Sequence, residues 1–186
     1  MARHRMFHRL IGALLGGAAL LGLTGCAPEP DPYSALAMVD DRPTLLIAEC
    51  ARSGIGYVTL WERASAASPV PATIPPRYPE WSVESPRSTP GPNGIRRSTE
   101  DAPARLTFFE KPSDWLISKE TLRAFREDAE YHVHGGLGNV ASLEFTLARL
   151  RELAPGEVLT AVGYRDQHVV SEAEFEEAAQ KVCDGP

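Results

Sequence analysis

The N-terminus places the strongest constraint on what this chain can fold into. Arg3, Arg5 and Arg9 precede an apolar run at residues 11–23 that carries no charge. A basic start followed by such a run is typical of a secretory signal peptide. The run has about 13 residues, and a helix needs about 18–20 to cross the hydrocarbon core, so a permanent transmembrane anchor is disfavoured. We therefore expect residues 1–25 to be removed and the remainder to fold outside the cytoplasm.

The end of this leader, Leu23-Thr24-Gly25-Cys26, resembles the lipobox of bacterial lipoproteins. The resemblance implies cleavage before Cys26 and attachment of a diacylglycerol to its thiol. It predicts a protein held by lipid on the extracytoplasmic face of the cell membrane. An ordinary signal peptide, or a cytoplasmic protein with an apolar start, is the alternative.

The cysteine count agrees with a lipid on Cys26. The chain has two other cysteines, Cys50 and Cys183, which form an even pair in an oxidising compartment. A bond between them would close a loop over nearly the whole folded domain and stabilise it by up to about 5 kcal/mol in the chain-entropy model. We predict this disulfide.

The charge of the processed chain excludes one class of partner. Removal of residues 1–25 takes away three of the 19 basic residues and none of the 25 acidic ones, which leaves a net charge of −9. Nucleic acid is therefore an unsuitable partner. The same charge disfavours adsorption of the domain onto an anionic membrane surface, so the lipid alone would hold the protein there.

Proline divides the processed chain into segments. Residues 26–42 are rich in Pro and Asp and are interpreted as an extended, lipidated tether. Residues 43–186 are long enough for one domain with a core. Within it, a Pro/Ser-rich loop is expected at 64–103, interrupted by one short strand at 81–85 where apolar and polar residues alternate. The loop is either a partner-binding arm that uses Tyr78 and Trp81 or a surface connection without a specific role.

Five runs rich in β-branched and aromatic residues predict strands. They lie at residues 44–50, 55–62, 105–110, 131–134 and 157–163. Arg52-Ser53-Gly54 predicts a hairpin between the first two. The second run is apolar on both faces, with Val58 and Leu60 on one of them, and is expected to be central in its sheet.

Two helices are expected near the C-terminus. Ser171 and Glu174 form a capping box, and Phe175 and Val182 then follow at helical spacing and are predicted to face inward. This helix would deliver Cys183 to Cys50. Thr146 is expected to cap a shorter helix that ends before Pro155-Gly156.

Several motifs over residues 43–183 resemble a loose group of actinobacterial lipoproteins of unassigned function. They are Arg42-Pro43-Thr44-Leu45-Leu46-Ile47 leading to a cysteine, Phe145-Thr146-Leu147, Pro155-Gly156-Glu157-Val158-Leu159, and Ser171-Glu172-Ala173-Glu174-Phe175 before Cys183. The resemblance implies a mainly β fold, an immunoglobulin-like β-sandwich with a short C-terminal helix. It implies no catalytic residues.

Gly136-Leu137-Gly138-Asn139-Val140-Ala141 matches a dinucleotide-binding fingerprint after a strand. Three observations oppose a dinucleotide site. Asp166 follows the glycines by about 30 residues, whereas the acidic residue of such a site usually follows them by about 20. In addition, only one βαβ unit fits, and the strand before the glycines is not uniformly apolar. A glycine-rich turn between antiparallel strands explains the same residues. We expect no cofactor.

Three histidines form the candidate metal site. His132 and His134 are two apart in a strand, so both imidazoles share one face and could hold a metal, with His168 as a third ligand. The alternative is a pair of solvent-facing histidines on an edge strand, opposite inward-facing Tyr131 and Val133. No carboxylate is expected beside the pair.

Nothing in the chain predicts a catalytic mechanism. G-x-S-x-G, H-E-x-x-H and paired catalytic acids are absent from the sequence, and the acidic clusters at 127–130 and 172–177 are interpreted as solvated helix faces. We therefore predict a non-enzymatic, lipid-anchored envelope protein whose loops contact a protein or an envelope polymer. A metal-binding lipoprotein is the alternative, and a small secreted hydrolase is a further one.

Overall fold

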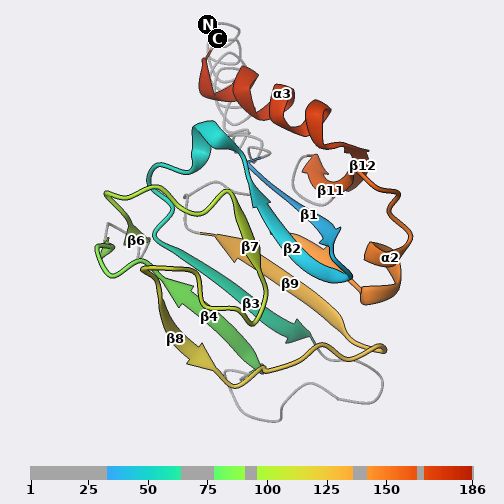
Figure 1. Ribbon diagram of the computed structural model, residues 1–186, viewed down its shortest axis with the longest axis horizontal. Helices are drawn as coiled ribbons and strands as arrows, with labels where there is room; N and C mark the ends of the chain where they lie inside the picture. Colours follow the sequence, from blue (N-terminus) through green and yellow to red (C-terminus); the bar gives the residue numbers. More distant parts are fainter. Residues whose placement is uncertain (1–32, 64–77, 91–95, 136–141, 163–165, 186) are drawn as a thin grey trace, which may run out of the picture.

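Two five-stranded antiparallel sheets, packed together, form the body of the protein (Figure 1). This computed structural model describes residues 33–63, 78–90, 96–135, 142–162 and 166–185. The predicted mainly β, sandwich-like fold with a short C-terminal helix is confirmed. The leader, Cys26 and the first part of the expected tether lie outside the described residues.

The first sheet has the strand order β12-β11-β1-β2-β7, and every neighbouring pair is antiparallel. Its strands are β1 (Ser34–Val39), β2 (Arg42–Ile47), β7 (Arg105–Thr107), β11 (Glu157–Val162) and β12 (Asp166–Ser171). Asp40 and Asp41 join β1 to β2 with φ of 50° and 60°. Positive φ at both central residues is the geometry of a two-residue hairpin turn whose twist matches its strands.

The second sheet has the order β10-β9-β3-β4-β8 and is also antiparallel throughout. Its strands are β3 (Tyr57–Arg63), β4 (Glu80–Glu84), β8 (Leu116–Glu120), β9 (Glu130–Gly135) and β10 (Leu143–Phe145). β3 is central in this sheet, as predicted. A separate two-stranded pair consists of β5 (Thr89–Pro90) and β6 (Arg96–Arg97).

The core fills the space between the two sheets. Alternate residues of each strand point into it, so that Leu36, Leu45 and Leu159 of the first sheet pack in one cluster with Leu60 and Val133 of the second. Several aromatic rings, among them Phe108, Phe125 and Phe145, contact one another in the same cluster. Burial of apolar area on this scale supplies most of the driving force for folding.

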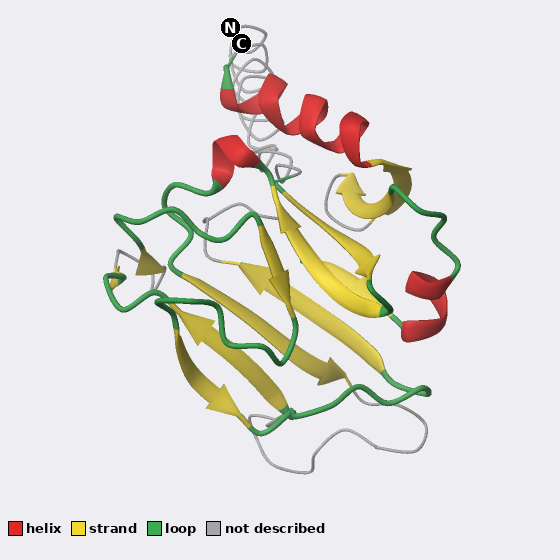
Figure 2. Ribbon diagram, in the orientation of Figure 1, coloured by secondary structure: helices red, strands yellow, loops and turns green. Residues whose placement is uncertain are grey.

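Three helical segments gather beside the first sheet (Figure 2). They are η1 (Glu49–Ala51), α2 (Leu147–Arg151) and α3 (Glu172–Cys183). The predicted caps are confirmed, because the Thr146 hydroxyl accepts from the Arg149 amide and Ser171 forms a capping box with Glu174. In α3, Phe175 is buried as predicted, but Val182 is 36% exposed, so its predicted inward orientation is wrong.

The boundary of the predicted tether is also wrong. The composition of residues 34–42 predicts an extended tether, but Ser34–Val39 is β1, which pairs with β2 on one side and β11 on the other. Its Ala residues carry little β-propensity, and burial on both faces removes the alternation that marks most strands. The part of the tether left outside the domain therefore ends near Tyr33.

The expected hairpin between the first two predicted strands does not form. β2 belongs to the first sheet and β3 to the second, and residues 48–56 connect them through η1. Within the predicted 64–103 loop, the expected short strand is confirmed as β4. Trp81 is fully buried in the core, so it cannot belong to an exposed partner-binding arm. Residues 64–77 and 91–95 lie outside the described residues.

Candidate functional site

The outer face of the second sheet carries the candidate site. Because side chains alternate along a strand, the residues between the core positions point away from the first sheet. They are Tyr57, Thr59, Trp61 and Arg63 on β3, Glu80 and Ser82 on β4, Glu130, His132 and His134 on β9, and Glu144 on β10. No helix among the described residues packs on this face.

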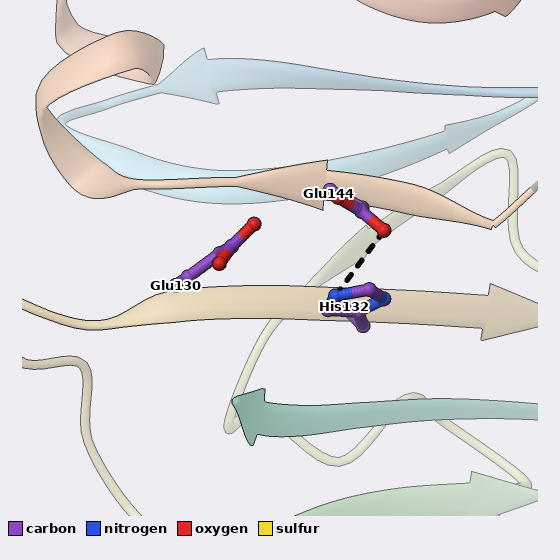
Figure 3. A group of neighbouring side chains, drawn as sticks. All are labelled: Glu130, His132 and Glu144. Carbon is purple, nitrogen blue, oxygen red and sulfur yellow. Dashed lines mark ion pairs between the residues drawn. The ribbon is translucent and has the colours of Figure 1, made fainter. Parts of the chain in front are cut away.

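Glu130, His132 and Glu144 come together on this face (Figure 3). Glu130 and His132 are two apart on β9, and Glu144 lies directly opposite His132 on β10. One ligand atom from each residue lies within 4.8 Å of the other two, and His132 Nε2 is 3.3 Å from Glu144 Oε1. Two carboxylates and an imidazole at this spacing form a set of potential metal ligands.

The imidazole of His132 is held from the side of β3. Trp61 is the cross-strand neighbour of His132, and the two rings are stacked at an interplanar angle of 13° with centroids 5.8 Å apart. His132 is 8% exposed, and its Nε2 atom is buried without a hydrogen-bond partner among the described residues. Burial lowers the pKa of His132 below its ordinary value, and the nearby Arg63 acts in the same direction, whereas Glu144 and Glu130 oppose it.

Arg63 is the only cation that the described residues place within 4.0 Å of both carboxylates. Its Nη1 atom is 4.0 Å from Glu130 Oε1 and 3.8 Å from Glu144 Oε1. Both distances exceed the range of a hydrogen bond. Its side chain is 51% exposed. Arg63 therefore offsets part of the charge of the two carboxylates without a hydrogen bond to either of them.

The histidine trio that the sequence suggested is not assembled. His132 and His134 do share a face, as predicted, but His134 lies beside Tyr57, with ring centroids 6.0 Å apart, and is not in the cluster. Burial lowers the pKa of His134. His168 lies on β12, in the other sheet.

Two further expectations about the histidines are wrong. β9 lies between β10 and β3 and is not an edge strand, and His132 is buried, not solvent-facing. Carboxylates do stand beside the pair, since Glu130 and Glu144 both contribute to the cluster. Glu130 was assigned to a solvated helix face, but it begins β9. The sequence gives no signal for Glu144, because β10 has only three residues and shows no visible alternation.

The glycine-rich segment at 136–141 lies outside the described residues, but its flanking strands are described. β9 and β10 are antiparallel neighbours. A dinucleotide-binding unit needs parallel strands joined by a helix, so the topology contradicts the dinucleotide hypothesis and agrees with the preferred interpretation that the segment connects antiparallel strands. Asp166 begins β12 in the other sheet and is far from this hairpin in the topology.

The predicted disulfide joins Cys50 to Cys183, with the Cα atoms 6.2 Å apart. Cys50 lies in η1 and Cys183 ends α3, so the bond fixes the C-terminal end of the helix beside the first sheet. Cys26 lies outside the described residues.

No helix among the described residues is long and apolar enough to cross a membrane. Comparisons of the chain with protein-family models, with curated proteins and with solved structures found no match.

Proposed function

We propose that this chain is a lipid-anchored, extracytoplasmic envelope protein that binds a partner and is not an enzyme. The observation that carries the proposal is the disulfide between Cys50 and Cys183. It leaves Cys26 as the single remaining cysteine, directly after the apolar leader and at the end of a lipobox-like sequence. A structural disulfide also fits an oxidising compartment. Membership in the actinobacterial lipoprotein group, with an immunoglobulin-like sandwich, is part of the same proposal.

The anchor would hold the domain close to the membrane. Seven residues lead from Cys26 to Tyr33, where the described domain begins, and they span at most about 25 Å when fully extended. Tyr33 and Gly135 line the same small cavity at one end of the sandwich. Glu130 is five residues from Gly135 along β9, about 17 Å away. The cluster around His132 would therefore lie toward the end that faces away from the membrane.

The outer face of the second sheet is the surface that we assign to the partner. Trp61 and His132 stack on this face, and the carboxylates of Glu130 and Glu144 lie beside them. Tyr57 and His134 form a second pair of rings on the same face. Aromatic groups flanked by hydrogen-bonding groups are common in binding surfaces. The partner would be an envelope protein or an envelope polymer.

The anchor is tested by metabolic labelling with a palmitate analogue. Wild type should be labelled and recovered with membranes, and Cys26→Ala should lose the label. The matched control is the double variant Cys50→Ala/Cys183→Ala, which retains Cys26 and should keep the label. Label that persists in Cys26→Ala would overturn the proposal.

The binding surface is tested by photo-crosslinking in intact cells. A photoreactive aromatic amino acid at Tyr57, on the outer face of the second sheet, should give a discrete crosslinked product. The same amino acid at Glu177, which is exposed on α3, is the matched control. Crosslinks from Glu177 but not from Tyr57 would place the partner on the other side of the domain.

A further inference from the structure

One β-hairpin supplies three potential metal ligands on a single face. In an antiparallel pair, residues directly opposite each other have Cβ atoms about 4.5–5.5 Å apart, and residues two apart on one strand share a face. Glu130, His132 and Glu144 satisfy both relations within β9 and β10. A zinc ion with bonds of about 2.0–2.2 Å needs ligand atoms about 3.4 Å apart in a tetrahedral arrangement. The distance of 3.3 Å between His132 Nε2 and Glu144 Oε1 meets this requirement.

The second observation is that Nε2 of His132 makes no hydrogen bond among the described residues. The whole residue is 8% exposed and its side chain 11%, and Nε2 is directed at the carboxylate of Glu144 (Figure 3). Its contact with Glu144 Oε1 has an ion-pair distance of 3.3 Å without hydrogen-bond geometry, so a cation bound by this nitrogen would supply an interaction that no hydrogen bond supplies. A cation between the nitrogen and the two carboxylates would satisfy all three.

The cluster combines the close ion pair of His132 and Glu144 with a more distant cation, Arg63. Elsewhere on the domain, carboxylates make close contacts with cations: Glu80 is 2.8 Å from Lys119, and Glu127 is 2.5 Å from Arg151. Arg63, in contrast, stays 3.8–4.0 Å from the two carboxylates of the cluster. Its positive charge should lower the affinity of the cluster for a cation.

We propose that Glu130, His132 and Glu144 bind a divalent first-row transition metal ion, represented by Zn²⁺, with the remaining coordination positions left for water or for a group of the partner. One imidazole nitrogen suits zinc and its neighbours, whereas Mg²⁺ and Ca²⁺ prefer oxygen ligands alone. Trp61, stacked on the imidazole, is a positioning residue that limits rotation of the ring. The inference rests on the proposed binding role of this face and is independent of the anchor on Cys26.

The test is a calorimetric titration of Zn²⁺ into the full chain, purified in detergent after treatment with a chelator. His4 and His8 of the leader are replaced by Asn in every sample, so that they do not bind the ion. We expect saturable binding of one ion per chain, little competition from a large excess of Mg²⁺, and a rise in Tm with Zn²⁺. Loss of an outer-shell group lowers metal affinity about 10–100-fold, so Glu144→Gln, which removes a direct ligand, should lower it at least about 100-fold.

Two further variants separate a metal site from an ion-pair network. Arg63→Gln removes the nearby cation and should tighten Zn²⁺ binding several-fold, a result that a network of ion pairs does not predict. His168→Asn, on the other sheet, is the matched histidine control and should bind Zn²⁺ as wild type does. Circular dichroism and Tm without metal establish that each variant is folded. Because Glu144 is 42% exposed, its replacement by an isosteric amide is compatible with folding.

Absence of saturable Zn²⁺ binding by wild type would overturn the inference. So would equal affinities of wild type and Glu144→Gln, or a loss of binding in His168→Asn. None of these results would affect the labelling or crosslinking experiments, so failure of the metal site is distinguishable from failure of the proposed function.

Discussion

The two sheets have the same number of strands but opposite kinds of outer face. On the first sheet this face is made of small and aliphatic residues, including Ala35, Ala37 and Val158, and it packs in one cluster with Phe175 and Ala179 of α3. On the second sheet it carries hydroxyl, imidazole, carboxylate and aromatic groups, and no helix among the described residues covers it.

The difference follows from the side chains. The alanines on β1 pack in the same cluster as Phe175 and Ala179 of α3, and an apolar face must be buried against another element. The polar groups of the second sheet instead interact with one another, as in the hydrogen bond between Ser82 and Thr59. One outer face therefore contributes to stability by packing against a helix, and the other is the face that we propose for binding. Substitutions on the two faces should separate these roles.

The largest effect is expected from loss of the disulfide. Cys50→Ala/Cys183→Ala opens a loop with a sequence separation of 133, which should lower the free energy of unfolding by up to about 5 kcal/mol because the unfolded chain gains entropy. Urea denaturation measures the change, and Cys26→Ala, which leaves the bond intact, is the control. A loss below about 1 kcal/mol would show that α3 is held without the bond.

The next effect concerns the packing of α3 on the first sheet. Phe175 is 1% exposed, so Phe175→Ala should destabilise the domain by about 3–4 kcal/mol through lost burial and a residual cavity. Glu177→Ala, on the exposed side of the same helix, removes only an i,i+4 pair with Lys181 and should change stability by less than about 0.5 kcal/mol. Equal losses in the two variants would contradict the assignment of this face to stability.

A smaller effect is expected at the start of α3. The Ser171 hydroxyl accepts a hydrogen bond from the Glu174 amide, and Ser171→Ala should cost about 1 kcal/mol. Thermal unfolding measures the loss. Ser171→Asn retains a capping acceptor and should recover most of it. A variant as stable as wild type would mean that packing of Phe175 alone fixes the first turn.

The features that were predictable from the sequence depend on local or countable properties. The α3 cap needs residues three apart, the apolar residues on both faces of β3 predict its central position, and the disulfide follows from the number of cysteines and the expected compartment. Each signal is complete within a short segment or within the composition. None of these predictions requires knowledge of which strands pair with each other.

The features that were missed depend on neighbours that are distant in sequence. β1 is buried on both faces, by the core and by α3, so no alternation identifies it. The candidate site depends on the register of β9 and β10, which places Glu144 opposite His132. The signal that was present was the Glu130-x-His132 spacing. This spacing places two side chains on one face only in a strand, and the interpretation of residues 127–130 as a helix face hides that relation.

The smallest effect is a change in how stability varies with pH, and it should come from the second sheet alone. Burial lowers the pKa of His132 and His134 in the folded protein, and the field of Arg63 acts in the same direction on His132, against Glu144 and Glu130. The unfolded chain therefore binds more protons than the folded one as the pH falls below about 6.5.

The stabilisation from the neutral imidazoles is consequently complete at pH values above the pKa of histidine in the unfolded chain. It is lost as the pH falls through the lower pKa values that His132 and His134 have in the folded protein. His132→Gln/His134→Gln should flatten the decline of the unfolding free energy between pH 7 and pH 5, measured by urea denaturation at each pH. Phe175→Ala, on the covered face, should lower the whole curve without changing its slope. If the histidine variant kept the slope of wild type, the acid sensitivity would lie elsewhere, and the two outer faces would not differ in this respect.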